Sequence, residues 1–465
     1  MPDVQSQDRP RPGPAEGDEV VVDIEDLAFG GRGVARTAEG LVIFVDGALP
    51  GESVRARVSR RRRGYAEAGL LELLRRSADR TTPPCEHYGA CGGCDLQHLS
   101  AEGQARAKRE QVRAILSRLA GLSEPPVGET VRAGEPWGYR FRIDFDWTAG
   151  RRGEPLLGLH RRGDPGAIVP ISRCHLISDA ANRLAHVLSA EAAARRLVPW
   201  ERRRRRGLLR RASFQEARAT REILITLETG RGDPPALGDL ARELPRRVTR
   251  VVGVVRREIE KGGEVVEDSI LWGRDHLFEE VEGDRFRVPS GAFFQPNTYA
   301  SAALRREAIR ALDSRAEDAV LELHCGVGFL TAALSRRARE VVAVEGAREA
   351  ILAARENAAR GGWRGVRFVH GEVAAVLPDL LRERAWDALL LDPPRTGLPR
   401  RAAQAIASSR VPRLVYVSCD PATLARDLRI LVETGGFRLV SVTPVDLFPQ
   451  THHVECVALV ARDPF

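Results

Sequence analysis

A cysteine and a glutamate in the C-terminal third of the chain are suited to covalent chemistry on an electron-poor ring. Cys419 directly follows an apolar run expected to be a buried strand, and Glu455 lies at the start of a later predicted strand. A cysteine thiolate is a strong nucleophile, and a carboxylate can remove a proton from the resulting adduct. Because a helix is expected from Pro421 to Leu431, we predict that its N-terminus lowers the pKa of the Cys419 thiol.

A buried structural role is the usual alternative for a cysteine. Cys325 and Cys456 lack the context of Cys419, and we expect both to be core residues.

The elements that must position Cys419 and Glu455 alternate between strands and helices from Ala319 onward, which predicts a doubly wound, Rossmann-like α/β fold with a parallel sheet. The last two strands have only a short connection and are expected to pair antiparallel. The predicted strands are Ala319–Leu323, Val341–Val344, Val366–Val369, Ala388–Leu391, Leu414–Val417, Phe437–Val445 and Val454–Val460.

Two further motifs lie where open α/β sheets bind their ligands. Cys325-Gly326-Val327-Gly328 follows the first of these strands and is expected to open a helix, and Glu345 ends the second strand, where it could bind ribose hydroxyls. Either a dinucleotide or S-adenosylmethionine fits this pattern. The glycine loop is too short for the pyrophosphate fingerprint, which favours S-adenosylmethionine. Asp392-Pro393-Pro394-Arg395 lies at the carboxyl end of the fourth strand.

Composition places the chain among globular proteins of two to four domains, since it has 465 residues, 43% hydrophobic and 29% charged. We expect residues 1–18 to be a disordered tail, and the chain to be cytoplasmic without a membrane partner. A net charge of +8 favours a polyanionic partner such as RNA. Lysine occurs only at Lys108 and Lys261, so part of the arginine content reflects composition rather than binding.

The N-terminal half is expected to form two domains. Short apolar runs and glycine turns over residues 19–78 predict a small OB-like β-barrel. Residues 79–285 are expected to form a central α+β domain, with a helix over Ala101–Leu119, followed by the C-terminal domain over 286–465. Three clustered cysteines and one distant cysteine could bind zinc or an iron-sulfur cluster, and their spacing does not decide between the two. They are Cys85, Cys91, Cys94 and Cys174.

Four segments, in order, resemble the RNA uracil-5 methyltransferase family. The segments are Phe293-Phe294-Gln295-Pro296-Asn297, Leu391-Asp392-Pro393-Pro394-Arg395, Ser418–Asp427 and Phe448–Glu455. The barrel likewise resembles a TRAM domain, through Gly30–Ala35 and Val45–Glu52.

The resemblance implies an S-adenosylmethionine-dependent enzyme in which Cys419 adds to C6 of uracil and Glu455 removes the C5 proton. It further implies that Gln295, His324, Glu345 and Asp392 contact the cofactor or the uracil edge, and that the four cysteines hold a 4Fe-4S cluster. The expected substrate is ribosomal RNA, most of all 23S RNA, with transfer RNA as the alternative, and we expect a monomer.

His324, Phe329 and Asp420 depart from the family pattern, which leaves details of cofactor contact open. A radical S-adenosylmethionine methylthiotransferase is disfavoured because the cysteine spacing is wrong for it. The other alternative is a non-catalytic RNA-binding protein with a degenerate methyltransferase domain.

Overall fold

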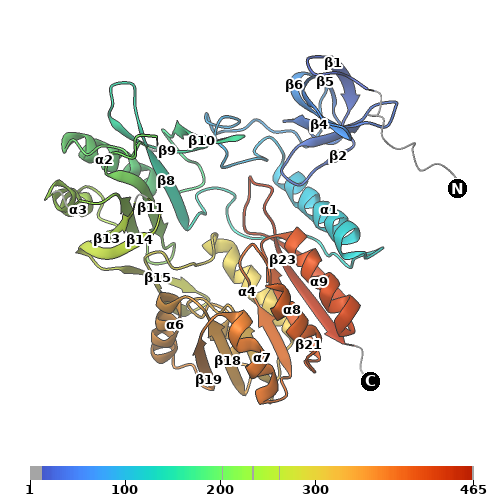
Figure 1. Cartoon of the computed structure of the whole chain (residues 1–465), viewed down its shortest axis with the longest axis vertical. Coiled ribbons are helices and arrows are strands. Elements are labelled where there is room, and N and C mark those ends of the chain that lie inside the picture. The colour runs from blue at the N-terminus through green and yellow to red at the C-terminus, as the bar shows by residue number, and fades with distance from the viewer. Residues whose placement is uncertain (1–12, 202, 233–234, 261, 463–465) are drawn as a thin grey trace.

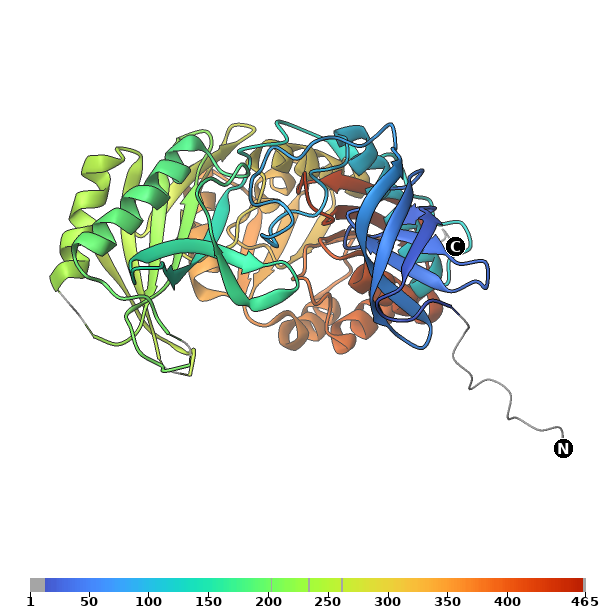
Figure 2. The same cartoon turned by 90° about the horizontal axis from the view of Figure 1, so that it is seen from above.

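The computed structural model describes residues 13–201, 203–232, 235–260 and 262–462. An N-terminal β-domain, a central sheet and a C-terminal α/β domain follow one another along the chain (Figure 1). Seen from above, the N-terminal and central domains lie at opposite ends, with the C-terminal domain between them (Figure 2). No helix in the described ranges is long and apolar enough to cross a membrane.

Six strands form the N-terminal domain around a core of small aliphatic side chains such as Ile43, Val45 and Val54. They are ordered β1-β5-β6-β4-β3-β2 in one sheet, in which β4 and β6 are parallel. Their bounds are β1 Glu19–Asp23, β2 Asp26–Leu27, β3 Gly33–Arg36, β4 Val42–Asp46, β5 Ser53–Arg61 and β6 Tyr65–Arg75.

The sequence predicted a disordered tail over residues 1–18, of which residues 1–12 lie outside the described residues. Its remainder contacts the N-terminal sheet: the Gly17 amide donates to the Val58 carbonyl, and the Val58 amide donates to the Asp18 carbonyl, each at 2.9 Å. The last two residues of the predicted tail therefore belong to the N-terminal domain.

The cysteine-bearing segment between the first two domains leads into helix α1, Ala101–Ala120. Its N-cap is Ser100, whose hydroxyl accepts from the Gly103 amide at 3.1 Å. The buried side chains Val112 and Leu116 pack into the core of the C-terminal domain, and β7 (Val131–Arg132) pairs with β22 of that domain's sheet. The structure thus places α1 and β7 on the C-terminal domain, whereas the predicted central domain of 79–285 included them.

A seven-stranded, mostly antiparallel sheet forms the central domain, ordered β10-β9-β8-β11-β12-β13-β14. Only β12 and β13 are parallel among these neighbours, and α3 connects them. The bounds are β8 Arg142–Ala149, β9 Pro155–Arg161, β10 Asp164–Pro170, α2 Asp179–Ala194, β11 Leu209–Glu216, β12 Ile223–Thr229, α3 Pro235–Arg247, β13 Val251–Ile259 and β14 Val265–Gly273. The hairpin of β15 (His276–Val281) and β16 (Asp284–Pro289) leads on to the C-terminal domain.

The C-terminal domain is an eight-stranded sheet ordered β19-β18-β17-β20-β21-β23-β22-β7. The strands β17 to β21 are parallel, and β22 and β23 pair antiparallel, as the sequence predicted. The strand bounds are β17 Ala319–Leu323, β18 Glu340–Glu345, β19 Val366–His370, β20 Ala388–Leu391, β21 Arg413–Ser418, β22 Phe437–Asp446 and β23 Glu455–Arg462. The helices are α4 Thr298–Leu312, α5 Thr331–Leu334, α6 Arg348–Gly361, α7 Val373–Glu383, α8 Arg400–Ala407 and α9 Pro421–Gly435.

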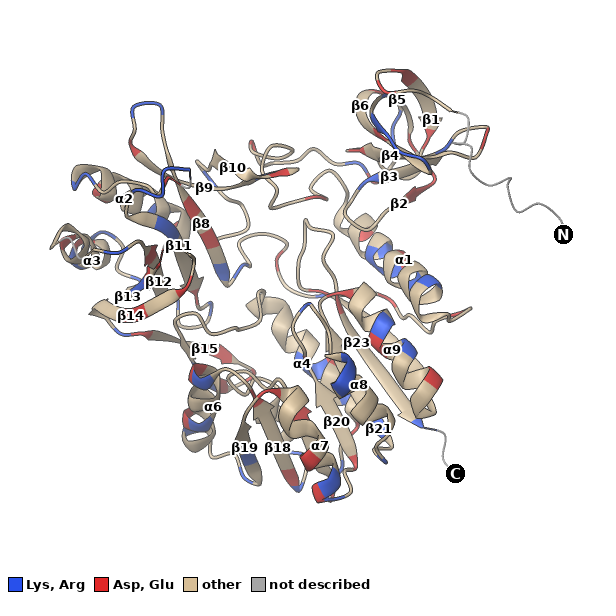
Figure 3. Cartoon of the chain, in the orientation of Figure 1, with Lys and Arg blue, Asp and Glu red and all other residues tan. Residues whose placement is uncertain are grey.

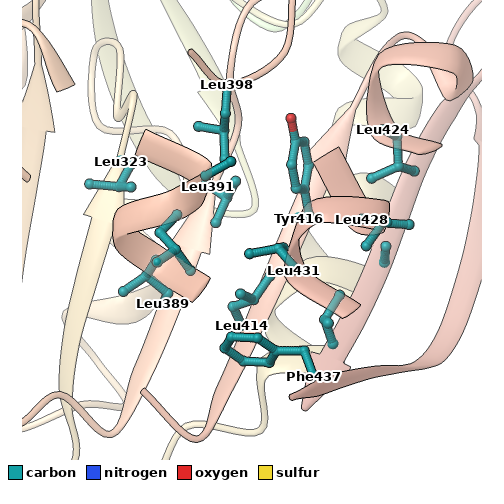
Figure 4. Packing of buried hydrophobic residues seen from close by; sticks show 14 of the residues in the cluster. Leu323, Leu389, Leu391, Leu398, Leu414, Tyr416, Leu424, Leu428, Leu431 and Phe437 are labelled. Atoms are coloured by element: carbon teal, nitrogen blue, oxygen red, sulfur yellow. The ribbon is translucent and has the colours of Figure 1, made fainter. Parts of the chain in front are cut away.

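Continuous apolar runs in these strands are explained by burial on both faces of the sheet. Figure 4 shows Leu414 and Tyr416 beside leucines of α9, with Leu389 of the same core on their other side. The Tyr416 hydroxyl, at the end of its ring, donates to the Asp427 carboxylate at 2.7 Å, which satisfies a buried polar group.

The strand order reverses between β17 and β20, because the chain proceeds from β17 to β18 and β19 on one side and then returns to β20 on the other. Such switch points are where doubly wound sheets bind ligands. The sequence predicted that a helix begins directly after the glycine loop, and this was wrong. Helix α5 begins only at Thr331 and has a single turn.

Candidate active site

Three predicted site residues converge at the carboxyl edge of the parallel sheet. Asp392 follows β20, Cys419 follows β21, and Glu455 is the first residue of β23. In the β21–β23 register Ser418 pairs with Cys456, so one further step brings Cys419 opposite Glu455. Directly opposed side chains of antiparallel strands have Cβ atoms roughly 4.5–5.5 Å apart.

The expected lowering of the Cys419 pKa is wrong for the structure without bound ligands. Burial and the nearby Glu455 carboxylate raise the pKa of this thiol to about 12, while Arg395 opposes the rise. The α9 N-terminus is already occupied, because the Asp420 side chain accepts from the amides of Ala422 and Thr423 at 2.9 and 3.0 Å. Asp420 is therefore the N-cap of α9, a role that asparagine and aspartate share.

Two carboxyl groups at this edge interact with each other. Glu455 is buried, and burial together with the charge of Asp392 raises its pKa well above the usual range. Burial also raises the pKa of Asp392, against a hydrogen bond from the Gln295 amide at 3.3 Å. Two such groups titrate as a pair, and their mutual repulsion together with burial favours the protonated form of one of them.

Arg395 is a cation that faces the Cys419–Glu455 pair, and its charge lowers the pKa of both groups. Its guanidinium donates to Nδ1 of His453 at 2.9 Å, and its carbonyl accepts from the Thr423 hydroxyl at 3.2 Å. Burial lowers the pKa of His453 to about 3, so the ring is neutral and accepts this bond. Sequence reasoning did not assign Arg395 or His453 a role, although both lie inside the recognised motifs.

A small cavity of about 50 Å³ adjoins this edge at the switch point, and Gln295, His324 and Asp392 line it. His324 has a φ of 62°, and its buried Nε2 has no hydrogen-bond partner among the described residues. Burial lowers the pKa of His324. An orphaned polar atom of this kind suits a site that binds a polar ligand.

Glu322 lies in the middle of the apolar strand β17, also lines this cavity, and was not singled out from the sequence. It is 1% exposed, and burial raises its pKa to about 8. The signal in the sequence was a carboxylate inside an otherwise apolar strand. Phe329, by contrast, packs edge-on against Phe294 with ring centroids 5.6 Å apart, which explains an aromatic residue at this position.

Glu345 ends β18 beside the glycine loop, as expected. One oxygen of its carboxylate accepts from the Gly326 amide at 2.9 Å, and the other accepts from the Ala347 amide at 2.7 Å. The side chain is thereby fixed at the point where the loop turns away from the sheet.

All four predicted metal-ligating cysteines line one cavity of about 490 Å³ between the linker segment and the central sheet. All four thiols are free. Burial raises the pKa of Cys94 to about 12 and of Cys174 to about 11, and the negative charges of the other thiols add to both rises. Among the described residues, no three such side chains lie close enough to hold a single metal ion.

Known protein families and relatives match nearly the whole chain. A family model described as tRNA (uracil-5-)-methyltransferase matches residues 263–463, and a TRAM domain model matches residues 15–71. An RNA methyltransferase of Gloeobacter violaceus is 38% identical over 453 residues, which cover 96% of this chain and 97% of that protein. The chain belongs to the RNA uracil-5 methyltransferase family. A second relative, an RNA methyltransferase of Halalkalibacterium halodurans, is 31% identical over 450 residues, covering 96% and 97% of the two chains.

The fold of this RNA methyltransferase also matches a solved structure. The tRNA (uracil-54, C5)-methyltransferase of Pyrococcus abyssi, in complex with S-adenosyl-L-homocysteine, aligns with a TM-score of 0.72 and 24% identity. The alignment covers 95% of this chain and 100% of that one. The Rossmann-like domain with an N-terminal TRAM domain is therefore confirmed.

Proposed function

We propose that this enzyme methylates C5 of a uridine in RNA through a covalent adduct between Cys419 and C6 of the base. The observation that carries the proposal is the register of β21 and β23, which brings Cys419 opposite a buried glutamate at the ligand-binding edge of the sheet. A nucleophile and a base in hydrogen-bond reach of one ring are what this reaction requires.

The roles of the two residues follow from the chemistry of uracil, whose C5 is too weak a nucleophile to take a methyl group directly. Attack of the Cys419 sulfur on C6 opens the C5–C6 double bond and places an electron pair on C5. S-adenosylmethionine supplies the methyl group that C5 takes. Glu455 then accepts the C5 proton, the double bond re-forms, and the bond between sulfur and C6 breaks to release the thiolate.

The raised pKa of the Cys419 thiol fits a nucleophile that is activated only when its ligands are bound. In the protein alone the thiolate would be a half-buried anion beside three carboxyl groups, with Arg395 as a partial counterion. A ligand that brings positive charge to this edge lowers the cost of the thiolate. The target base must leave any stacked helix to reach Cys419.

Gln295, His324, Glu345 and Asp392 are our candidates for contacts with S-adenosylmethionine or the uracil edge. Three of them line the cavity at the switch point, and Glu345 is held beside the glycine loop. The unpaired Nε2 of His324 supports a polar ligand there.

For the substrate we propose ribosomal RNA, most of all 23S RNA, with transfer RNA as the alternative. The N-terminal TRAM domain and the four-cysteine cavity support ribosomal RNA, since both match the resemblance on which this assignment rests. The transfer RNA activity named for the Pyrococcus abyssi protein favours the alternative. We further propose that the enzyme acts as a monomer in the cytoplasm, where such RNA is found.

We also propose that Cys85, Cys91, Cys94 and Cys174 hold a 4Fe-4S cluster with a structural role. Four free thiols on one cavity form a donor set that suits iron-sulfur ligation. The iron atoms of the cluster would supply the positive charge that stabilises the thiolate forms of these cysteines.

The test uses RNA from a strain that lacks this gene, methyl-labelled S-adenosylmethionine and mass-spectrometric mapping of 5-methyluridine. We expect label in 23S RNA. Label in transfer RNA alone would move the substrate to the alternative, and no cofactor binding by calorimetry would favour a non-catalytic RNA-binding protein.

A second arm tests the covalent adduct. Glu455→Gln should stall before proton removal and accumulate a labelled RNA–protein band on a denaturing gel, because elimination of Cys419 waits for that step. The wild-type enzyme should form a similar band with 5-fluorouracil RNA. If neither protein forms an adduct, the covalent mechanism is wrong.

A further inference from the structure

The loop of residues 447–454, which joins β22 to β23 and ends at Glu455, is held by residues more than 300 positions away. The carbonyl of Gln450 accepts from the amides of Asp95 and Leu96 at 3.0 and 2.9 Å. The side chain of Gln104 accepts from the Gln450 amide at 2.8 Å and donates to its side-chain oxygen at 3.1 Å.

Gln450 itself has a φ of 72°, a left-handed backbone that is strained for a residue with a side chain. Such strain persists only where surrounding contacts impose it. The contacts from Asp95, Leu96 and Gln104 hold Gln450 in this conformation.

The Asp95 side chain makes a second link to the same loop. Its carboxylate contacts Nδ1 of His452 at 2.6 Å, and the His452 and His453 rings lie 4.1 Å apart. His453 accepts from Arg395, the cation that faces Cys419 and Glu455. A continuous set of contacts thus runs from Asp95 to the catalytic edge.

On its other side Asp95 is bonded to Cys94, whose sulfur lines the four-cysteine cavity. Arg162 holds the two residues together, since its guanidinium donates to the Cys94 carbonyl and contacts the Asp95 carboxylate at 3.1 Å. None of the four cysteines lies within a helix or a strand of two or more residues. A ligand shared by four sulfurs would therefore fix a stretch of backbone that regular secondary structure does not.

We propose that Asp95 is a positioning residue that couples the four-cysteine cavity to the loop carrying Glu455, so that a metal group bound by the cysteines sets the geometry of the base. Both tests rest on the proposed metal group, whereas only the second rests on the proposed methylation, because the first measures the coupling without any turnover.

The first test compares amide hydrogen exchange in the protein as purified with its metal, in the protein stripped of metal, and in Cys94→Ser. Loss of the metal should speed exchange at residues 447–454 by at least about 10-fold, while helix α6 (Arg348–Gly361) serves as the internal reference. Unchanged exchange in the loop, or purification of a protein with no metal on these thiols, overturns the coupling. This result does not depend on which RNA is methylated, or on whether any is.

The second test is a double-mutant cycle of Asp95→Asn and His452→Phe, in which phenylalanine keeps a ring beside Phe29. Each change should lower kcat about 10-fold with little change in KM for RNA, and the double variant should be no worse than either. Asp79→Asn is the matched control, since Asp79 pairs with Arg106 in the same part of the chain and does not contact the loop. Losses that simply multiply, or an equal loss in the control, overturn the role of the Asp95–His452 pair.

Discussion

The candidate catalytic edge and the four-cysteine cavity are both clusters of buried and half-buried ionisable groups, but the chain builds them differently. Cys419 and Glu455 lie at strand ends whose register is fixed by the ladder between β21 and β23. The four cysteines lie on irregular backbone between domains. The first site is therefore organised by the fold, whereas the second would be organised by the metal group that we propose for it.

The electrostatics of the two clusters are alike and carry a common lesson. Burial raises the pKa of Cys419 in the first and of Cys94 and Cys174 in the second, and neighbouring acidic groups raise each further. Arg395 at the first cluster and Arg140 at the second oppose the rise without cancelling it. Both are therefore suited to ligands that bring positive charge, and they differ in how much of the fold depends on that ligand.

The largest effect is expected from Cys419→Ala, which tests the preorganised site. Methyl transfer should fall by at least about 1,000-fold, because no other group supplies the addition at C6. S-adenosylmethionine should bind as before by calorimetry, and the melting temperature should change little, since the sheet holds the site without the thiol. Full activity in this variant would end the assignment of Cys419.

Cys91→Ser tests the ligand-organised site and should act mainly on stability. The purified wild-type protein should be brown with about four irons per chain, matching the four thiols of the cluster, and the variant should lose both iron and colour. Its melting temperature should fall by at least about 5 °C, because metal binding contributes folding free energy. Cys419→Ser is the matched control and should keep its iron. Stoichiometric zinc in the wild-type protein would replace the cluster assignment but leave the comparison intact.

Glu322→Gln tests how much the burial of a carboxyl group beside the catalytic edge lowers the free energy of unfolding. The pKa of Glu322 is raised to about 8 in the folded protein. At any pH between the ordinary pKa of a glutamate and about 8, the chain therefore takes up a proton when it folds. The wild-type free energy of unfolding should therefore fall relative to the variant by roughly 1.4 kcal/mol per pH unit as pH rises from about 5 to 8. The two curves should run parallel below about pH 4. Parallel curves across the whole range would mean that Glu322 is ionised in the folded protein.

The smallest effect on activity is expected from the exposed arginines of the N-terminal domain, which belong to neither the catalytic edge nor the four-cysteine cavity. Arg60 and Arg62 are exposed at the end of β5 and in the turn to β6, among the basic side chains of the N-terminal sheet (Figure 3). Changing both to serine should weaken RNA binding a few-fold and reduce the slope of log affinity against log salt by about 1 to 2. The modified uridine should stay the same, because phosphate contacts position an RNA without reading its sequence. A shifted methylation site would assign these arginines a role in selecting the uridine.

The elements of the C-terminal sheet were predictable because their signals are local. The apolar runs at Ala319–Leu323 and Ala388–Leu391 are strands with the predicted bounds. What the sequence did not reveal depends on distant partners. The packing of α1 on the C-terminal domain and the Asp95–His452 contact join segments far apart in the chain. The direction of the Cys419 pKa shift was missed for the same reason, since burial and the Glu455 carboxylate act on the thiol only in the folded structure.

The pairing of Lys108 with Asp446 has a consequence for how the chain is made. The two groups meet at 2.5 Å in the interior, although 338 residues separate them. At a synthesis rate of roughly 5–20 residues per second, Lys108 is made about 20 to 70 s before its partner. During that interval the apolar face of α1 has no domain to pack against. The buried Lys108 therefore stays without its carboxylate partner, and Val112 and Leu116 without the C-terminal core, until synthesis has reached the last strands.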